Sequence, residues 1–266
     1  MPKVKVNNFN MYYEVHGDGF PLIMIGGLGG NIYWWDTILI DELSKNFKTV
    51  VFDNRGVGRS DDPDEDFLIK TMADDMVGLM NALEIERAHV LGISMGGSIA
   101  QEIVINYPEM VEKLVLCACS CGGSKSVPPS IEVLNLLMSF VGRKHDLKLV
   151  KEVLPLMFTE DFMKKNPDYI EDKIEMILKT PTTASTYKRQ LEAGMKSPTR
   201  CRKLKKVDTQ TLVIHGKKDI LNPTQNGEIL TNLIPNAKLA LFDNNAHWVF
   251  YPEPEKVIET ILAFLK

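Results

Sequence analysis

The feature that most constrains the fold is the alternation of short apolar runs with amphipathic helical patterns along most of the chain. The apolar runs lie at residues 22–25, 49–53, 89–93, 113–119, 212–215 and 239–242. Several are apolar almost throughout, as expected for parallel strands that are covered on both faces. Before them, residues 3–6 and 11–15 alternate with polar residues and are typical of a hairpin. We therefore predict an α/β domain with a mainly parallel sheet flanked by helices.

The alternation of strands and helices stops between about residues 122 and 202. No convincing strand pattern occurs there, and helical patterns cover residues 130–141, 146–158, 160–179 and 183–196. An all-helical insertion in a sheet domain is the simplest interpretation. We predict a core in two parts, residues 1–122 and 204–266, around a helical cap of residues 123–203.

Composition and charge argue against several classes of protein. The chain has 31 Lys and Arg against 35 Asp and Glu, a net charge of −4, which gives it no electrostatic attraction to nucleic acid or anionic membranes. Its first residues lack the apolar stretch of a secretory signal, and it has no apolar run of the roughly 18 residues that span a bilayer. We expect a cytoplasmic protein, and a homo-oligomer is compatible with the sequence.

The four cysteines are Cys117, Cys119, Cys121 and Cys201. The first three alternate, which places them on one face if the segment is a strand. Their spacing lacks the C-x2-C pairs of zinc sites. We expect small, buried, apolar side chains in a reduced protein.

The segment around Ser94 is the clearest indication of chemistry. Gly92-Ile93-Ser94-Met95-Gly96 has the form G-x-S-x-G, with a predicted strand before it and a predicted helix after it, as this motif requires. The sharp turn lifts the serine hydroxyl above the sheet. The start of the following helix offers N–H groups and partial positive charge to a developing oxyanion. We predict that Ser94 is a nucleophile.

A serine nucleophile needs a base, and the base needs an acid to hold it. His247 follows the last strand, at the edge where α/β sheets carry catalytic groups. The other four histidines lie in the hairpin, at or inside strands, or in the insertion: His16, His89, His145 and His215. We therefore predict His247 as the base.

Three aspartates follow strands and could be the acid. Asp219 comes just after residues 212–215 and fits best. Asp243 is so close in sequence to His247 that it would need an awkward turn. Asp53 is followed by Arg55, which favours a structural ion pair there.

These residues resemble the α/β-hydrolase fold superfamily over essentially the whole chain. The resemblance covers Asp53-Asn-Arg-Gly-Val-Gly-Arg-Ser60, the turn at Ser94, Asp219 and His247. The segments 72–89 and 92–101 are most similar to the carboxylesterase and 3-oxoadipate enol-lactonase group. The resemblance implies an eight-stranded sheet, a helical cap inserted after the sixth strand and a Ser-Asp-His triad.

The glycine-rich segment 25–30 is where the family supplies a second oxyanion donor. The match implies Leu28 as a backbone donor beside the N–H of Met95, with Gly26 where many members have histidine. Hydrolases that cleave C–C bonds of ring-cleavage products often have a glycine-rich version here and Trp after the catalytic His, as His247-Trp248 does. That class therefore stays open.

Other functions fit the sequence less well. Gly27-Leu28-Gly29-Gly30 imitates a dinucleotide-binding motif, but Ile32 occupies the position of the third glycine. Haloalkane dehalogenases and epoxide hydrolases of this fold have Asp at the position of Ser94. A non-catalytic binding protein would normally lack one of the three triad residues.

We predict a serine hydrolase of small carboxylic esters or lactones, an enzyme of the EC 3.1.1 class. The sequence places Gly27, Trp35 and Trp248 as candidate substrate-binding residues. It contains no cluster of ligands for a metal, and we expect no cofactor. The alternatives are hydrolysis of a C–C bond and acyl transfer, in which an alcohol or amine replaces water.

Overall fold

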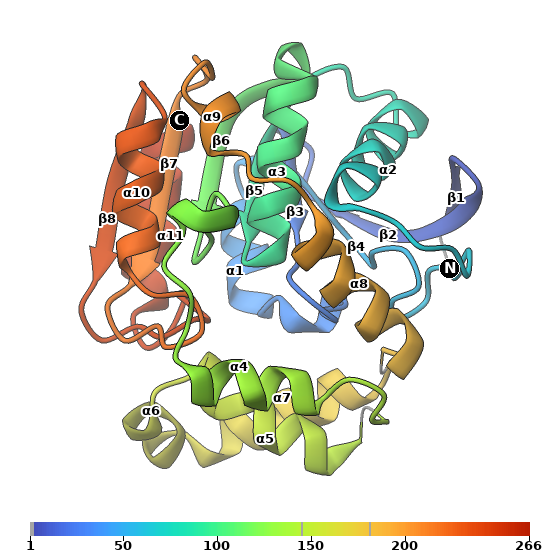
Figure 1. The fold of residues 1–266 in the computed structure, drawn as a ribbon. Helices are drawn as coiled ribbons and strands as arrows, with labels where there is room; N and C mark the ends of the chain where they lie inside the picture. The colour runs from blue at the N-terminus through green and yellow to red at the C-terminus, as the bar shows by residue number, and fades with distance from the viewer. Residues whose placement is uncertain (1–2, 145, 181) are drawn as a thin grey trace.

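The computed structural model describes residues 3–144, 146–180 and 182–266. An eight-stranded sheet with strand order β1-β2-β4-β3-β5-β6-β7-β8 forms its centre (Figure 1). The strands are β1 (Lys3–Val6), β2 (Phe9–His16), β3 (Phe20–Ile25), β4 (Phe47–Phe52), β5 (Ala88–Ile93), β6 (Val111–Cys117), β7 (Thr211–Gly216) and β8 (Ala237–Phe242).

The six strands from β4 to β8 in this order are parallel, and β2 joins them antiparallel through β4. β1 and β2 form the predicted hairpin, with Val6 opposite Phe9. After β3 the chain adds β4 on one side of the sheet, and after β5 it adds β6, β7 and β8 in turn on the other side. Ligands of such sheets bind where this order reverses, outside the carboxyl ends of the strands. The segments after β3 and β5 meet at that point.

Helices cover both faces because each strand buries alternate side chains on opposite sides. Ile23, Val50 and Val90 pack with α2 (Ile69–Ala82), α3 (Met95–Asn106) and α10 (Gln225–Leu233). Leu22, Val51 and Leu91 face the opposite side, with α1 (Thr37–Ser44) and α11 (Pro254–Leu265). The three-layer arrangement confirms the predicted α/β class, with a mainly parallel sheet flanked by helices. Within the described residues, short 3-10 helices lie in connections: η1 (Ile32–Trp34), η2 (Pro108–Met110) and η3 (Gly123–Lys125).

The chain between β6 and β7 is helical, as expected, and most of it forms a layer at the bottom of Figure 1. Its helices in the described residues are α4 (Ile131–Ser139), α5 (Leu147–Met157), α6 (Glu160–Lys165), α7 (Pro167–Leu178), α8 (Ala184–Lys196) and α9 (Cys201–Leu204). The single helix predicted over residues 160–179 is wrong. Pro167 begins a new helix, and Asn166 before it is non-helical, because proline disfavours a helical residue ahead of it.

The expectation for the cysteines needs two corrections. β6 ends at Cys117, and Ala118 has a positive φ of 45°, so the strand face does not extend to Cys119 and Cys121. Cys121 and Cys201 form a disulfide, with their Cα atoms 5.1 Å apart, because the two ends of the helical insertion lie side by side. Cys117 and Cys119 are free and buried, as expected.

A disulfide does not support the reduced setting that we inferred from the cysteine spacing, because such bonds persist mainly in oxidising compartments. Cytoplasmic localisation therefore stays a prediction. None of the helices in the described part of the chain has the length and apolar character needed to cross a membrane.

Candidate active site

Ser94 lies on a strained turn between β5 and α3. Its φ of 55° and ψ of −121° are unusual for a residue with a side chain. Close backbone contacts around the turn require glycine on both sides. A Cβ on Gly92 would lie 2.3 Å from the carbonyl oxygen of Gly96, and a Cβ on Gly96 would lie 2.1 Å from that of Ile25. The G-x-S-x-G motif therefore forms the sharp turn between strand and helix that the sequence predicts.

Asp219 and His247 come together in a buried pair. His247 Nδ1 and Asp219 Oδ2 are 2.8 Å apart, and the two residues are only 2% and 6% exposed. The other carboxylate oxygen, Oδ1, accepts N–H bonds from Leu221 (2.9 Å) and Asn222 (2.7 Å). These contacts hold the carboxylate so that it can orient the imidazole, which is the role predicted for it.

Burial alone would raise the pKa of Asp219, because it removes water from the charged form. The positive charge and hydrogen bond of His247, together with those of His215, outweigh burial and lower the pKa to about 2. His215 Nε2 lies 3.3 Å from Asp219 Oδ2 and 2.7 Å from the carbonyl oxygen of Asn222. The carboxyl group is therefore ionised at neutral pH.

The backbone links Ser94 to this pair across the carboxyl edge of the sheet. Ser94 N–H donates to Cys117 O, Ala118 N–H to Ile214 O, and Lys218 N–H to Asn245 O, at 2.9, 2.9 and 3.0 Å. Ser94 thus lies at the same edge as Asp219 and His247. In the described residues the Ser94 hydroxyl has no hydrogen bond to His247. Catalytic hydrogen bonds are often long before substrate binds.

The predicted oxyanion donors lie beside the turn. Met95 is the first residue of α3, so its N–H has no partner within the helix. A Cβ on Gly27 would lie 3.2 Å from the Cβ of Ser94, so the segment carrying Leu28 passes close to the serine. Gly29 is held from the helical cap, residues 123–203: its N–H donates to Gln190 Oε1 (2.8 Å), and its carbonyl accepts from Thr182 (2.7 Å). Sequence reasoning did not find these two cap residues.

The cap packs over the site. A buried cluster of Phe140, Leu149, Leu156 and Tyr187 packs against both Leu28 and Leu221. Leu28 belongs to the predicted oxyanion segment, and Leu221 lies two residues after Asp219. The apolar inner side of the cap is therefore next to the predicted catalytic groups.

Trp35 and Trp248 are each 4% exposed and belong to an aromatic cluster. The ring centroids of Trp248 lie 5.6 Å from Trp35 and 5.2 Å from Phe250. This packing explains their burial. Contact of Trp35, Trp248 or Gly27 with substrate stays a prediction.

Asp53 has a structural role, but its partner differs from the expected one. It pairs with Arg59, whose Nε lies 3.0 Å from Asp53 Oδ2, and its Oδ1 accepts the N–H of Ile32 at 2.8 Å. Arg55 instead pairs with Asp75 on α2, where both side chains are almost fully buried. Closeness in the sequence to Asp53 was misleading because the fold of the loop gives Arg55 and Arg59 different carboxylate partners.

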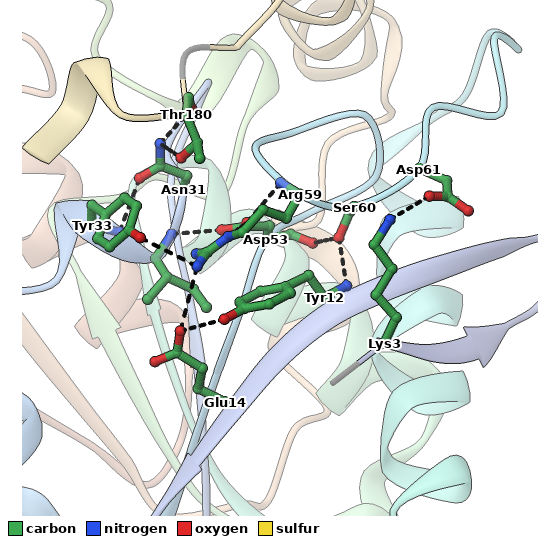
Figure 2. A network of polar contacts seen from close by, with 11 residues as sticks. Lys3, Tyr12, Glu14, Asn31, Tyr33, Asp53, Arg59, Ser60, Asp61 and Thr180 are labelled. Carbon is green, nitrogen blue, oxygen red and sulfur yellow. Dashed lines mark hydrogen bonds and ion pairs between the residues drawn. The ribbon is translucent and has the colours of Figure 1, made fainter. Parts of the chain in front are cut away.

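Figure 2 shows how the Asp53–Arg59 pair braces this region. The guanidinium lies 3.7 Å from the ring centroid of Tyr12 and also approaches Glu14 and Tyr33. Asn31 directly follows the glycine-rich segment 25–30, which carries the predicted oxyanion donor Leu28. Its side-chain amide donates to the carbonyl oxygen of Thr180 at 2.7 Å. These contacts join β2, β4, the oxyanion segment and the chain at residue 180.

Of the rejected candidates, His215 contacts Asp219, and the others that the structure describes lie elsewhere. Asp243 forms a surface ion pair with Lys217 at 2.7 Å and is 73% exposed at its side chain. His16 lies in β2, and His89 packs against Phe20 and Phe47. His145 lies outside the described residues.

The chain matches the family model of the α/β-hydrolase fold over residues 21–254, and it belongs to this family. A relative from Rhizobium rhizogenes, named as a candidate carbamate hydrolase, RutD, is 30% identical over 263 residues. The match covers 96% of this chain and 98% of the relative. The resemblance inferred from the motifs is thereby confirmed.

Solved structures have the same fold. The enol-lactonase from Burkholderia xenovorans LB400 is 24% identical, with a TM-score of 0.88 over 99% of both chains. A thermophilic esterase from Thermogutta terrifontis is 25% identical, with a TM-score of 0.85 over 100% of this chain and 98% of the esterase. A meta-cleavage product hydrolase from Pseudomonas fluorescens IP01 is 23% identical, with a TM-score of 0.85 over 100% and 97%. Membership of the family and the similarity to the RutD relative support hydrolase activity.

Proposed function

We propose that this hydrolase cleaves a small carboxylic ester or lactone through an acyl-enzyme on Ser94. The observation that carries the proposal is the Asp219–His247 pair, at 2.8 Å, on the same sheet edge as the strained turn of Ser94. A nucleophile, a base and an orienting acid in this order are the parts that acyl transfer needs.

In the proposed mechanism, Ser94 Oγ attacks the carbonyl carbon while His247 Nε2 takes the hydroxyl proton. The backbone N–H groups of Leu28 and Met95 stabilise the oxyanion that forms. The intermediate then collapses, and His247 gives its proton to the departing alkoxide oxygen. Water, deprotonated by His247, attacks the acyl carbon, and His247 then gives this proton to the departing Ser94 Oγ, which releases the acid and restores the serine hydroxyl and the neutral imidazole.

The first prediction tests the nucleophile. Ser94→Ala should lower kcat by about 10⁴-fold or more, because the triad acts as a unit. A fluorophosphonate should label Ser94 in the wild-type protein, and peptide mass spectrometry would locate the label. Labelling of another serine, or a Ser94→Ala variant with undiminished turnover, would remove the basis of the proposal.

The bond that is cleaved can be tested with a substrate panel. We would compare p-nitrophenyl esters of graded chain length, simple lactones, an enol-lactone, an aryl carbamate and a dienone diacid. Turnover of esters or lactones supports the proposal. Exclusive turnover of the dienone diacid would assign C–C hydrolysis, and exclusive turnover of the carbamate would assign the activity that the name of the RutD relative indicates. Product that forms only with an added alcohol or amine would assign acyl transfer.

A further inference from the structure

Asp36, between η1 and α1, is a buried carboxylate with three side-chain donors. Its Oδ1 accepts from Tyr169 Oη and Lys173 Nζ, each at 2.8 Å, and its Oδ2 accepts from Trp248 Nε1 at 2.9 Å. Tyr169 and Lys173 lie on α7 of the cap, and Trp248 directly follows His247. One carboxylate therefore joins the core, the cap and the loop that carries the predicted base.

Lys173 is buried as deeply as its partner. Its side chain is 4% exposed, and its ammonium group also donates to the carbonyl oxygen of Trp34 at 2.6 Å and lies 5.4 Å from the ring centroid of Trp248. Burial lowers the pKa of Lys173, although the charge of Asp36 opposes this effect. A buried ion pair contributes little net stability compared with apolar packing, so stability alone is a weak reason for this one.

The contacts of Trp248 connect the pair to the site. Its backbone N–H donates to the carbonyl oxygen of Met157, the last residue of α5, at 2.9 Å. Its indole N–H donates to Asp36. The residue next to His247 is thus held at two points, one by α5 of the cap and the other by the carboxylate that also holds α7. Any shift of Asp36 or the cap is transmitted to His247 through a single peptide unit.

We propose that Asp36 is a positioning residue for His247. It holds the cap and the base-carrying loop in one geometry, so that the imidazole stays aligned between Asp219 and Ser94. This inference rests on the proposed function, because it takes His247 as the base. A misplacement of about 1 Å at a catalytic group can slow a reaction about 100-fold.

The test measures the rate of fluorophosphonate labelling of Ser94 per folded molecule, together with kcat and KM for a p-nitrophenyl ester. Asp36→Asn removes the charge and turns one acceptor oxygen into a donor, and Trp248→Phe keeps an aromatic ring but removes the indole donor and part of the ring system. Both should slow labelling by about 10- to 100-fold and lower kcat. For Asp36→Asn, which is not a candidate substrate-binding residue, KM should change much less. Urea unfolding gives the folded fraction to which each rate is normalised.

Two further variants separate positioning from general stability. Asp75→Asn breaks another buried pair, with Arg55, whose guanidinium packs against Phe9 and Phe67 and not against the predicted catalytic residues; it should destabilise the protein but leave labelling of folded molecules unchanged. The double variant Asp36→Leu/Lys173→Met replaces both charges by apolar groups and should recover stability, yet still label slowly.

Labelling of Asp36→Asn or of the double variant at the wild-type rate would overturn the inference, and so would an equal slowing by Asp75→Asn. A wild-type protein that is not labelled at Ser94 would overturn the proposed function, and the inference with it. The two failures are therefore distinguishable.

Discussion

At the scale of single residues, two aspartates that follow strands have opposite surroundings. Asp219 is buried against His247, whereas Asp243 is exposed beside Lys217. Asp219→Asn should lower kcat/KM by about 10⁴-fold, because the neutral amide holds the imidazole in the wrong tautomer, as in serine proteases. Asp243→Asn should stay close to wild type, since it loses only a surface ion pair. Steady-state kinetics of both variants decide the assignment, and the reverse result would make Asp243 the acid.

At the scale of elements, the disulfide Cys121–Cys201 joins the end of the segment after β6 to the start of α9. It closes a loop with a sequence separation of 80 residues. In the chain-entropy model, closure of a loop of this size stabilises the folded state by about 4.5 kcal/mol. Reduction should therefore lower Tm, because the unfolded chain gains the freedom that the bond had removed.

Calorimetry with and without a phosphine reductant measures this effect. The double variant Cys121→Ala/Cys201→Ala should melt at the lower temperature under both conditions. If the wild-type Tm were unchanged by reduction that mass spectrometry shows to be complete, the bond would not stabilise the fold.

At the scale of the whole molecule, stability should fall in acid in two stages. Burial, with a smaller effect of Lys113, lowers the pKa of His89 from 6.5 to about 4. The unfolded chain therefore binds this proton first, and about 3 kcal/mol of stability should be lost as the pH falls from 6.5 to about 4. The pKa of Asp219 is lowered from 3.8 to about 2, so a further loss of about 2 kcal/mol should follow between these values.

Urea unfolding at a series of pH values measures both stages. His89→Phe should abolish the first stage, because a ring that cannot be protonated then packs against Phe20 and Phe47. A variant that loses stability between pH 6.5 and 4 as steeply as wild type would show that another group is responsible.

The parts of the site that lie on one continuous segment could be predicted from the sequence. The turn at Ser94 is recognised from the motif itself, and the contact that requires glycine at Gly92 lies within the motif, whereas Gly96 is required by its close approach to Ile25 on β3. Asp219 and His247 could also be chosen, since parallel strands bring their carboxyl ends to one edge whatever lies between them. Their meeting at 2.8 Å agrees with that choice. The catalytic roles themselves await the experiments above.

Hydrophobic periodicity alone thus determined the strands, their mainly parallel arrangement and the helical insertion. The reason is that burial of one or both faces of an element fixes the spacing at which apolar residues recur along it. Only the tertiary structure decided which polar groups meet across the chain. Asp36 with Lys173, Arg55 with Asp75, Gly29 with Gln190 and Cys121 with Cys201 each join segments that are far apart in sequence. Such pairs leave no periodic trace, because each depends on how finished elements pack and on the need to give every buried polar group a partner.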